Sequence, residues 1–241
     1  MKGRHQLRAL GKNELPERIE LDGHTLGLRK LFKHTAFAAV GLYGNEVRQV
    51  VLKCHRTARL LGLPLAWLGE LMARYEAAVL RHVHDIRGVP RLVGMHGRTG
   101  LIHEYVPGEP LTRDTEVDMQ FCRELFLLVR RLHERGVAYV DLEKAENILV
   151  GDDGLPYLFD FQVAFHVPER CLGRTFPVRW LRRQLQKADL YHVRKHFRRL
   201  KRDHLSPSQR RRLRRKPWFV ELGTAVSTPF KKFRRWILGK T

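Results

Sequence analysis

Apolar residues in the first part of the chain form short runs and one long helical stripe. Residues 28–32 and 37–42 are expected to form strands, and residues 50–53 are an apolar run of strand length that ends in lysine. Between residues 67 and 84 apolar side chains recur at the helical spacing, at Leu68, Leu71, Met72, Tyr75, Val79, Leu80 and Val83. The pattern predicts strands followed by an amphipathic helix.

Further along, the pattern predicts more strands and a hairpin. Strands are expected within residues 89–93 and 100–109, the second ending in a Pro-Gly turn. Two short apolar runs, at residues 148–150 and 156–159, flank an Asp-Asp-Gly turn at residues 152–154, which is typical of a β-hairpin.

Three side chains with metal-binding oxygens accompany this hairpin. Asp141 precedes it, Asn147 opens its first strand and Asp160 closes its second strand, so the hairpin should bring them to one edge. Carboxylate and amide oxygens are the ligands that Mg²⁺ prefers, and phosphoryl transfer requires Mg²⁺ at the phosphates. The alternative is an ordinary hairpin with surface acids, which is disfavoured by the apolar alternation around Asp160 at Phe159, Phe161, Val163 and Phe165.

This stretch resembles the catalytic core of the protein-kinase-like superfamily. The resemblance implies that Asp141 orients and deprotonates an acceptor hydroxyl, while Asn147 and Asp160 bind the metal. One departure is that Asn147 stands six positions after Asp141, one more than in the family. Either the extra residue bulges outward or Glu146 takes the metal role. In addition, Gln162 replaces the family's glycine, which argues against a flipping activation switch.

The resemblance extends upstream to a nucleotide-binding half. Lys53 ends its apolar run like the kinase lysine that contacts the α and β phosphates. Glu76 lies beside the helical stripe and is the favoured ion-pair partner of Lys53, with Glu70 as the alternative. Any of the three could instead be an ordinary solvated residue.

The hinge and the phosphate-covering loop carry weaker signals. In the family arrangement, the adenine edge hydrogen-bonds to backbone groups near Glu104 and Val106. Residues 33–39 contain no Gly-x-Gly-x-x-Gly motif, so Lys33 and Thr35 are the candidate phosphate contacts there. An ordinary hairpin is the alternative.

These features predict an α+β fold with the two lobes of a protein kinase. An antiparallel sheet with one helix would form the N-lobe over residues 1–106, and a mainly helical C-lobe with the catalytic loop would span residues 107–216. Residues 217–241 would form a basic amphipathic tail. Asp189 lies in a segment that resembles a C-lobe helix of small bacterial kinases, including those that phosphorylate lipopolysaccharide core sugars. By that resemblance Asp189 would brace the catalytic loop.

Charge is distributed very unevenly along the chain. The formal net charge is +21, and residues 170–241 contain 23 Lys and Arg against three acids. Such density predicts a polyanionic partner, although a solubilising surface is an alternative. Aromatic residues between the basic ones favour an anionic membrane surface over nucleic acid, because a helical face would hold Phe230, Phe233, Trp236 and Ile237.

Other features of the sequence concern location. No apolar run is long enough to cross a bilayer, and the three cysteines lack metal-binding or redox spacing. We therefore expect a cytoplasmic protein, peripheral on the cytoplasmic face of the inner membrane.

The resemblance implies ATP and Mg²⁺ as cofactors, with Mn²⁺ as an alternative metal. The expected acceptor is a hydroxyl on a lipopolysaccharide core sugar, because that phosphorylated sugar and the bilayer are both anionic. An atypical RIO-like protein serine/threonine kinase is the first alternative. The second is a catalytically inactive, kinase-shaped binding module whose tail holds a polyanion.

Overall fold

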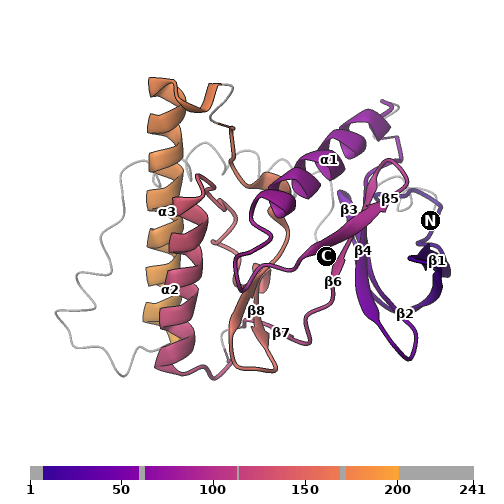
Figure 1. Ribbon diagram of the computed structural model, residues 1–241, viewed down its shortest axis with the longest axis horizontal. Helices are drawn as coiled ribbons and strands as arrows, with labels where there is room; N and C mark the ends of the chain where they lie inside the picture. Colours follow the sequence, from indigo (N-terminus) through magenta and orange to yellow (C-terminus); the bar gives the residue numbers. More distant parts are fainter. Residues whose placement is uncertain (1–7, 60–62, 113, 169–171, 201–241) are drawn as a thin grey trace. The chain divides into compact units, whose positions relative to one another are not determined.

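The structure is a computed structural model that describes residues 8–59, 63–112, 114–168 and 172–200 (Figure 1). The tail predicted for residues 217–241 lies outside these described residues. The chain divides into two compact units, and each is described by itself. The first unit comprises Met1–Asp85 and Val89–Pro107, and the second comprises Ile86–Gly88 and Gly108–Thr241.

The first unit is built on a six-stranded antiparallel sheet with the order β1-β2-β3-β4-β6-β5. Its strands are β1 Arg18–Leu21, β2 His24–His34, β3 Ala38–Gly44, β4 Gln49–His55, β5 Leu92–His96 and β6 Gly100–Glu104. The predicted runs correspond to β2, β3 and β4, whereas β5 begins later than the run at residues 89–93. The sequence did not predict β1, because Ile19 is its one buried residue.

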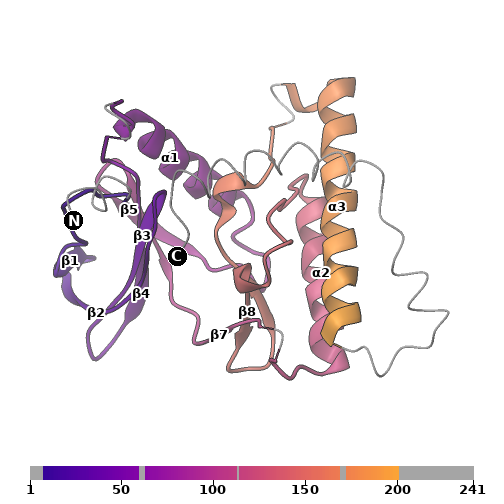
Figure 2. The ribbon, with the colours of Figure 1, turned by 180° about the vertical axis from the view of Figure 1, so that it is seen from behind.

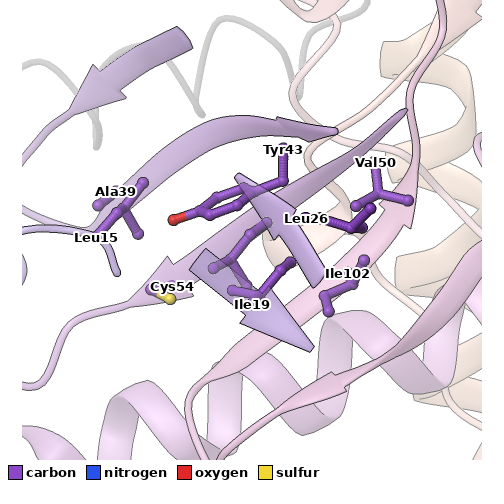
Figure 3. Packing of buried hydrophobic residues seen from close by; sticks show 9 residues of the cluster. Leu15, Ile19, Leu26, Ala39, Tyr43, Val50, Cys54 and Ile102 are labelled. Carbon is purple, nitrogen blue, oxygen red and sulfur yellow. The ribbon is translucent and has the colours of Figure 1, made fainter. Parts of the chain in front are cut away.

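A hydrophobic cluster lies against one face of this sheet (Figure 3). It consists of Leu15, Ile19, Leu26, Ala39, Tyr43, Val50, Leu52, Cys54 and Ile102. The Tyr43 hydroxyl donates a 2.5 Å hydrogen bond to the Pro16 carbonyl, so its polar end is satisfied. Side chains alternate between the two faces along a strand. Val50, Leu52 and Cys54 of β4 belong to the cluster, so Lys53 and His55 lie on the opposite face of the sheet.

The helix α1, Ala66–His82, packs against β4, β5 and β6. Small residues make this contact close, since a Cβ on Gly69 would lie 2.0 Å from the Arg56 carbonyl oxygen. The predicted apolar stripe is therefore only partly correct: Val79, Leu80 and Val83 are buried, but Leu71 is exposed. The helix approaches through Gly69 and Ala73, and larger side chains lie beside the contact.

The second unit contains a three-stranded antiparallel sheet and two long helices. The sheet has the order β7-β8-β9, with β7 Gly108–Pro110, β8 Ile148–Gly151 and β9 Pro156–Leu158. The helices α2, Met119–Glu134, and α3, Phe176–Leu200, lie side by side (Figures 1 and 2). The predicted hairpin is β8 and β9. No helix within the described part of the chain is long and apolar enough to span a membrane.

Candidate active site

In the first unit, Lys53 on β4 forms a buried ion pair with Glu76 on α1. The Lys53 ammonium lies 2.8 Å from Glu76 Oε1 and 2.7 Å from Oε2, and the two side chains are 4% and 2% exposed. Glu70 instead pairs with Arg74 and Arg98, whose side chains are largely exposed. The ion pair favoured by the sequence is therefore the one present.

His55 is a third member of this cluster and was not predicted from the sequence. Its Nε2 lies 3.0 Å from Glu76 Oε2, and the side chain is fully buried. The signal was available, because a residue two positions after Lys53 on the same strand faces the same side. The Glu76 carboxylate therefore has two nitrogen-bearing neighbours from β4.

The turn between β2 and β3 stands where the family has a glycine-rich loop. The Thr35 hydroxyl accepts hydrogen bonds of 3.3 Å from the Phe37 and Ala38 amides. The Arg56 guanidinium donates a 2.7 Å hydrogen bond to the Ala36 carbonyl and thereby holds the turn. The structure thus gives Thr35 a role in the turn. Lys33 is half-buried near the end of β2, and its phosphate contact stays a prediction.

The predicted hinge follows β6. The Glu104 amide donates a 2.9 Å hydrogen bond to the Arg91 carbonyl, and the Glu104 carbonyl accepts one of 2.9 Å from His103 Nδ1. Val106 is half-buried in the connection that follows. The adenine contacts near Glu104 and Val106 both stay predictions.

In the second unit, Asp141 lies in the loop after α2 and contacts two side chains. Its Oδ2 accepts hydrogen bonds of 2.5 Å from the Lys144 ammonium and 2.9 Å from the Asn147 amide. The same amide also donates to the Asp141 carbonyl at 3.2 Å. Because the Asn147 amide nitrogen makes both of these contacts, its amide oxygen is not used in binding Asp141. Lys144 was not predicted from the sequence, although it stands only three residues after Asp141.

The extra residue between Asp141 and Asn147 is absorbed in a short 3-10 helix, Ala145–Asn147. Glu146 is exposed in this turn, whereas Asn147 is buried. Of the two alternatives left by the sequence, the geometry matches the outward bulge. A metal role for Glu146 has no support from its position.

Asp160 follows β9 in the left-handed backbone region, with φ of 69°. Tyr139 holds the residues on both sides of it: its hydroxyl donates to the Phe159 carbonyl, and its ring packs edge-on against Phe161 at 5.1 Å. The pairing of Ile148 with Leu158 places Asn147 and Asp160 at the same end of the hairpin.

The expectation that apolar neighbours of Asp160 are buried is met in part. A 3-10 helix, Phe161–Val163, follows Asp160. Phe161 is fully buried, whereas Val163 is exposed. The turn forms because the left-handed conformation of Asp160 ends the extended backbone.

Asp189 of α3 braces the loop that precedes Asp141, as expected. Its carboxylate accepts 2.8 Å hydrogen bonds from the Tyr139 and Val140 amides and lies 3.0 Å from His133 Nε2. Val140 has φ of 72°, which a β-branched residue rarely adopts. Such strain persists only where surrounding contacts enforce it, and it often marks functional sites. Here the strained residue, Val140, directly precedes Asp141.

A second contact from α3 holds the loop after Asp141. His196 Nε2 donates a 2.7 Å hydrogen bond to the Leu142 carbonyl, and the side chain is buried. Burial lowers the pKa of His196, which disfavours the charged imidazolium. The helix therefore fixes the loop on both sides of Asp141.

The described residues contain no group of three or more His, Cys, Asp or Glu side chains able to hold a metal. Asn147 and Asp160 nevertheless offer two hard oxygens, and Mg²⁺ bound with a nucleotide takes its other ligands from phosphates and water. The residues present thus fit such an ion.

Comparison with known proteins supports the fold. No family model matches the chain. The Rio2 kinase from Chaetomium thermophilum is 17% identical, with a TM-score of 0.53 over 71% of this chain and 57% of that one. A complex of the same kinase with ADP, Mg²⁺ and phosphoaspartate gives 17% identity and a TM-score of 0.51, over 86% and 62% of the two chains.

The BubR1 kinase domain is 16% identical, with a TM-score of 0.50 over 65% of this chain and 53% of that one. The chain thus spans less than two thirds of each of these structures. They confirm the predicted α+β, protein-kinase-like fold. None of them indicates a likeness to lipopolysaccharide kinases.

Proposed function

We propose that the protein is an ATP-dependent phosphotransferase that moves the γ-phosphate to a hydroxyl group. The buried ion pair between Lys53 and Glu76, in a chain with this fold, is the observation that carries the proposal. Removing two charges from water costs several kcal/mol per ion, which an apolar pair would avoid. Holding the Lys53 ammonium for the α and β phosphates gives this costly arrangement a purpose.

Residues of the second unit supply the remaining roles. Asp141 orients the acceptor hydroxyl and takes its proton, and Lys144 neutralises charge beside it. Asn147 and Asp160 would hold Mg²⁺ through their oxygens, and the ion would supply charge neutralisation at the phosphates. The solved complex of the Rio2 kinase with ADP and Mg²⁺ is consistent with these cofactors.

The basic charge of the C-terminal part of the chain is our basis for proposing a phosphate acceptor. A phosphorylated lipopolysaccharide core sugar remains our preferred acceptor because residues 170–241 are strongly basic. The likeness to the Rio2 kinase favours the alternative of a protein serine or threonine acceptor. Incubation with labelled ATP and separate lipid, sugar and protein fractions will distinguish them, since label should enter one fraction only.

Two substitutions test the phosphotransferase itself. Asp141→Asn should keep Mg²⁺-ATP binding and lower the transfer rate by about 10²–10⁴-fold, the usual contribution of a general base. Asp160→Ala should weaken Mg²⁺-ATP binding, because it removes a carboxylate ligand. Titration calorimetry measures the binding, and release of labelled phosphate or product measures the transfer.

Asp152→Asn is the matched control, because Asp152 is an exposed acid of the β8–β9 turn and should leave both quantities unchanged. Full turnover in Asp141→Asn would remove the proposed base. Nucleotide binding without transfer to any fraction would support the inactive binding module instead.

A further inference from the structure

Several large apolar side chains are exposed at the start of α3 and just before it. Leu172, Phe176, Trp180 and Leu181, here called the α3 tip, are 65%, 81%, 45% and 41% exposed. Phe176 and Trp180 stand four residues apart and therefore share a helix face. Large apolar side chains that gather on a surface commonly mark a binding site.

The α3 tip is exposed because α2 ends before reaching it. The last turn of α2 meets α3 at Gln186, whose side chain donates a 3.1 Å hydrogen bond to the His133 carbonyl. Beyond it, Gly136 lies close to Arg182. The turns of α3 that precede Arg182 extend past the end of α2 in both views (Figures 1 and 2).

Arginines surround these apolar side chains. Arg174, Arg179 and Arg183 line a surface cavity of about 220 Å³ together with Phe176 and Trp180. Residues 172–188 contain five Lys and Arg and no acid. Among the described residues, no carboxylate pairs with Arg179 or Arg183. Arg179 and Arg183 therefore place positive charge beside the exposed apolar area.

We propose that the α3 tip binds the surface of an anionic lipid bilayer. Its apolar side chains enter the boundary between headgroups and acyl chains, and the arginines bind lipid phosphates through paired N–H donors. Trp suits this boundary because its ring is apolar while its N–H is polar. The inference concerns binding only and does not depend on the proposed phosphotransferase activity.

Other occupants fit this surface less well. A single-stranded nucleic acid would stack on Phe176 and Trp180, but Leu172 and Leu181 offer it nothing. The chain's own residues 201–241 contain 13 Lys and Arg against two acids, so like charges oppose their docking here. A second copy would bring the same arginines together and is disfavoured for the same reason.

The test uses the full chain and sedimentation with vesicles of phosphatidylcholine alone or mixed with phosphatidylglycerol. The variant Phe176→Ser/Trp180→Ser should lower the partition coefficient on the mixed vesicles by about tenfold or more. The control is Trp67→Ser/Leu71→Ser, because both residues are similarly exposed on α1. That control should stay within about twofold of the unmodified protein.

A second measurement separates the α3 tip from general charge attraction. Brominated acyl chains should quench the unmodified protein more than the variant that lacks Trp180, because insertion places this indole near the bromines. Residues 201–241 are present in every variant, so a difference between variants reports on the α3 tip.

Equal partitioning of the Phe176→Ser/Trp180→Ser variant and the unmodified protein, with unchanged circular dichroism, would overturn the proposal. Binding to a single-stranded oligonucleotide that is lost in this variant, while vesicle binding persists, would overturn it in favour of nucleic acid. Retained phosphoryl transfer to a soluble acceptor in the variant would show that the two proposals stand separately.

Discussion

At the residue scale, the Glu76 carboxylate is the centre of the buried polar cluster in the first unit. Lys53 and His55 both approach it from β4, at 2.7 and 3.0 Å. Inside a protein the electrostatic attraction between such a carboxylate and its polar neighbours is strong. If the carboxylate is removed, burial of the unpaired Lys53 and His55 side chains becomes energetically unfavourable. The cluster therefore sets both the position of the Lys53 ammonium and part of the stability of this unit.

Replacing Glu76 by Ala should therefore be strongly destabilising. We expect the free energy of unfolding to fall by about 3–5 kcal/mol, because the Lys53 charge would stay buried without its partner. Urea unfolding measures this change. Glu70→Ala is the control, since its ion pairs involve exposed arginines and should contribute less than about 1 kcal/mol each.

The double variant Lys53→Met/Glu76→Leu separates stability from function. It removes both charges of the pair together, so it should recover most of the stability lost in Glu76→Ala while failing to bind Mg²⁺-ATP normally. If the double variant unfolded as easily as Glu76→Ala, the loss would not come from an unpaired Lys53 charge.

At the element scale, α1 and α3 are held by different interactions: α1 by close backbone packing and α3 by hydrogen bonds from polar side chains. The helix α1 approaches β4 through small residues, so its position is set by backbone proximity at Gly69. The helix α3 instead reaches the catalytic loop through polar side chains, Asp189 and His196. The first contact should respond to added volume and the second to protonation.

Adding a methyl group to α1 at Gly69 tests the close approach. Gly69→Ala should lower the free energy of unfolding by about 1–3 kcal/mol, because the new Cβ meets the Arg56 carbonyl and the helix must shift. This direction opposes helix propensity, which favours Ala over Gly. Gly27→Ala is a control for added volume, since nothing lies within 4 Å of its Cβ. Thermal or urea unfolding gives both values.

Acidification tests the contacts of α3. Burial lowers the pKa values of His192 and His196 below their usual 6.5. Below about pH 6.5 these histidines therefore bind more protons in the unfolded chain than in the folded one. Their contribution to the free energy of unfolding is complete above this pH and decreases as the pH falls. We expect urea unfolding to show a stability decrease from pH 7 to pH 5.

The variant His192→Asn/His196→Gln should show a weaker pH dependence, because neither replacement titrates. Gln at position 196 keeps an N–H donor for the Leu142 carbonyl. His34 also has a pKa lowered by burial and should account for part of the remaining slope. An unchanged slope in the variant would assign the dependence to groups outside α3.

At the scale of the whole molecule, charge separates the chain into two parts. Nearly all of the net charge of +21 belongs to residues 170–241. Deleting residues 217–241 should reduce recovery on anionic vesicles at low salt and leave Mg²⁺-ATP binding unchanged. Vesicle sedimentation and calorimetry measure the two effects. Recovery that does not change with salt, or that is equal on neutral vesicles, would contradict an electrostatic role for this segment.

The sequence by itself determined the local features of this protein. The apolar runs gave β2, β3, β4 and the β8–β9 hairpin, since strand and turn preferences act over a few residues. The order of Lys53, Glu76, Asp141, Asn147 and Asp160 in the sequence indicated the protein-kinase-like fold.

Only the tertiary structure decided which of these side chains meet. It paired Lys53 with Glu76, added His55 to them, and turned Asn147 toward Asp141 while leaving Glu146 exposed. These outcomes depend on packing between segments distant in sequence, as when Asp189 binds the amide of Tyr139 fifty residues earlier. Periodicity shows which face of a helix is apolar, but only the approach of its neighbour shows which residues lie in the contact.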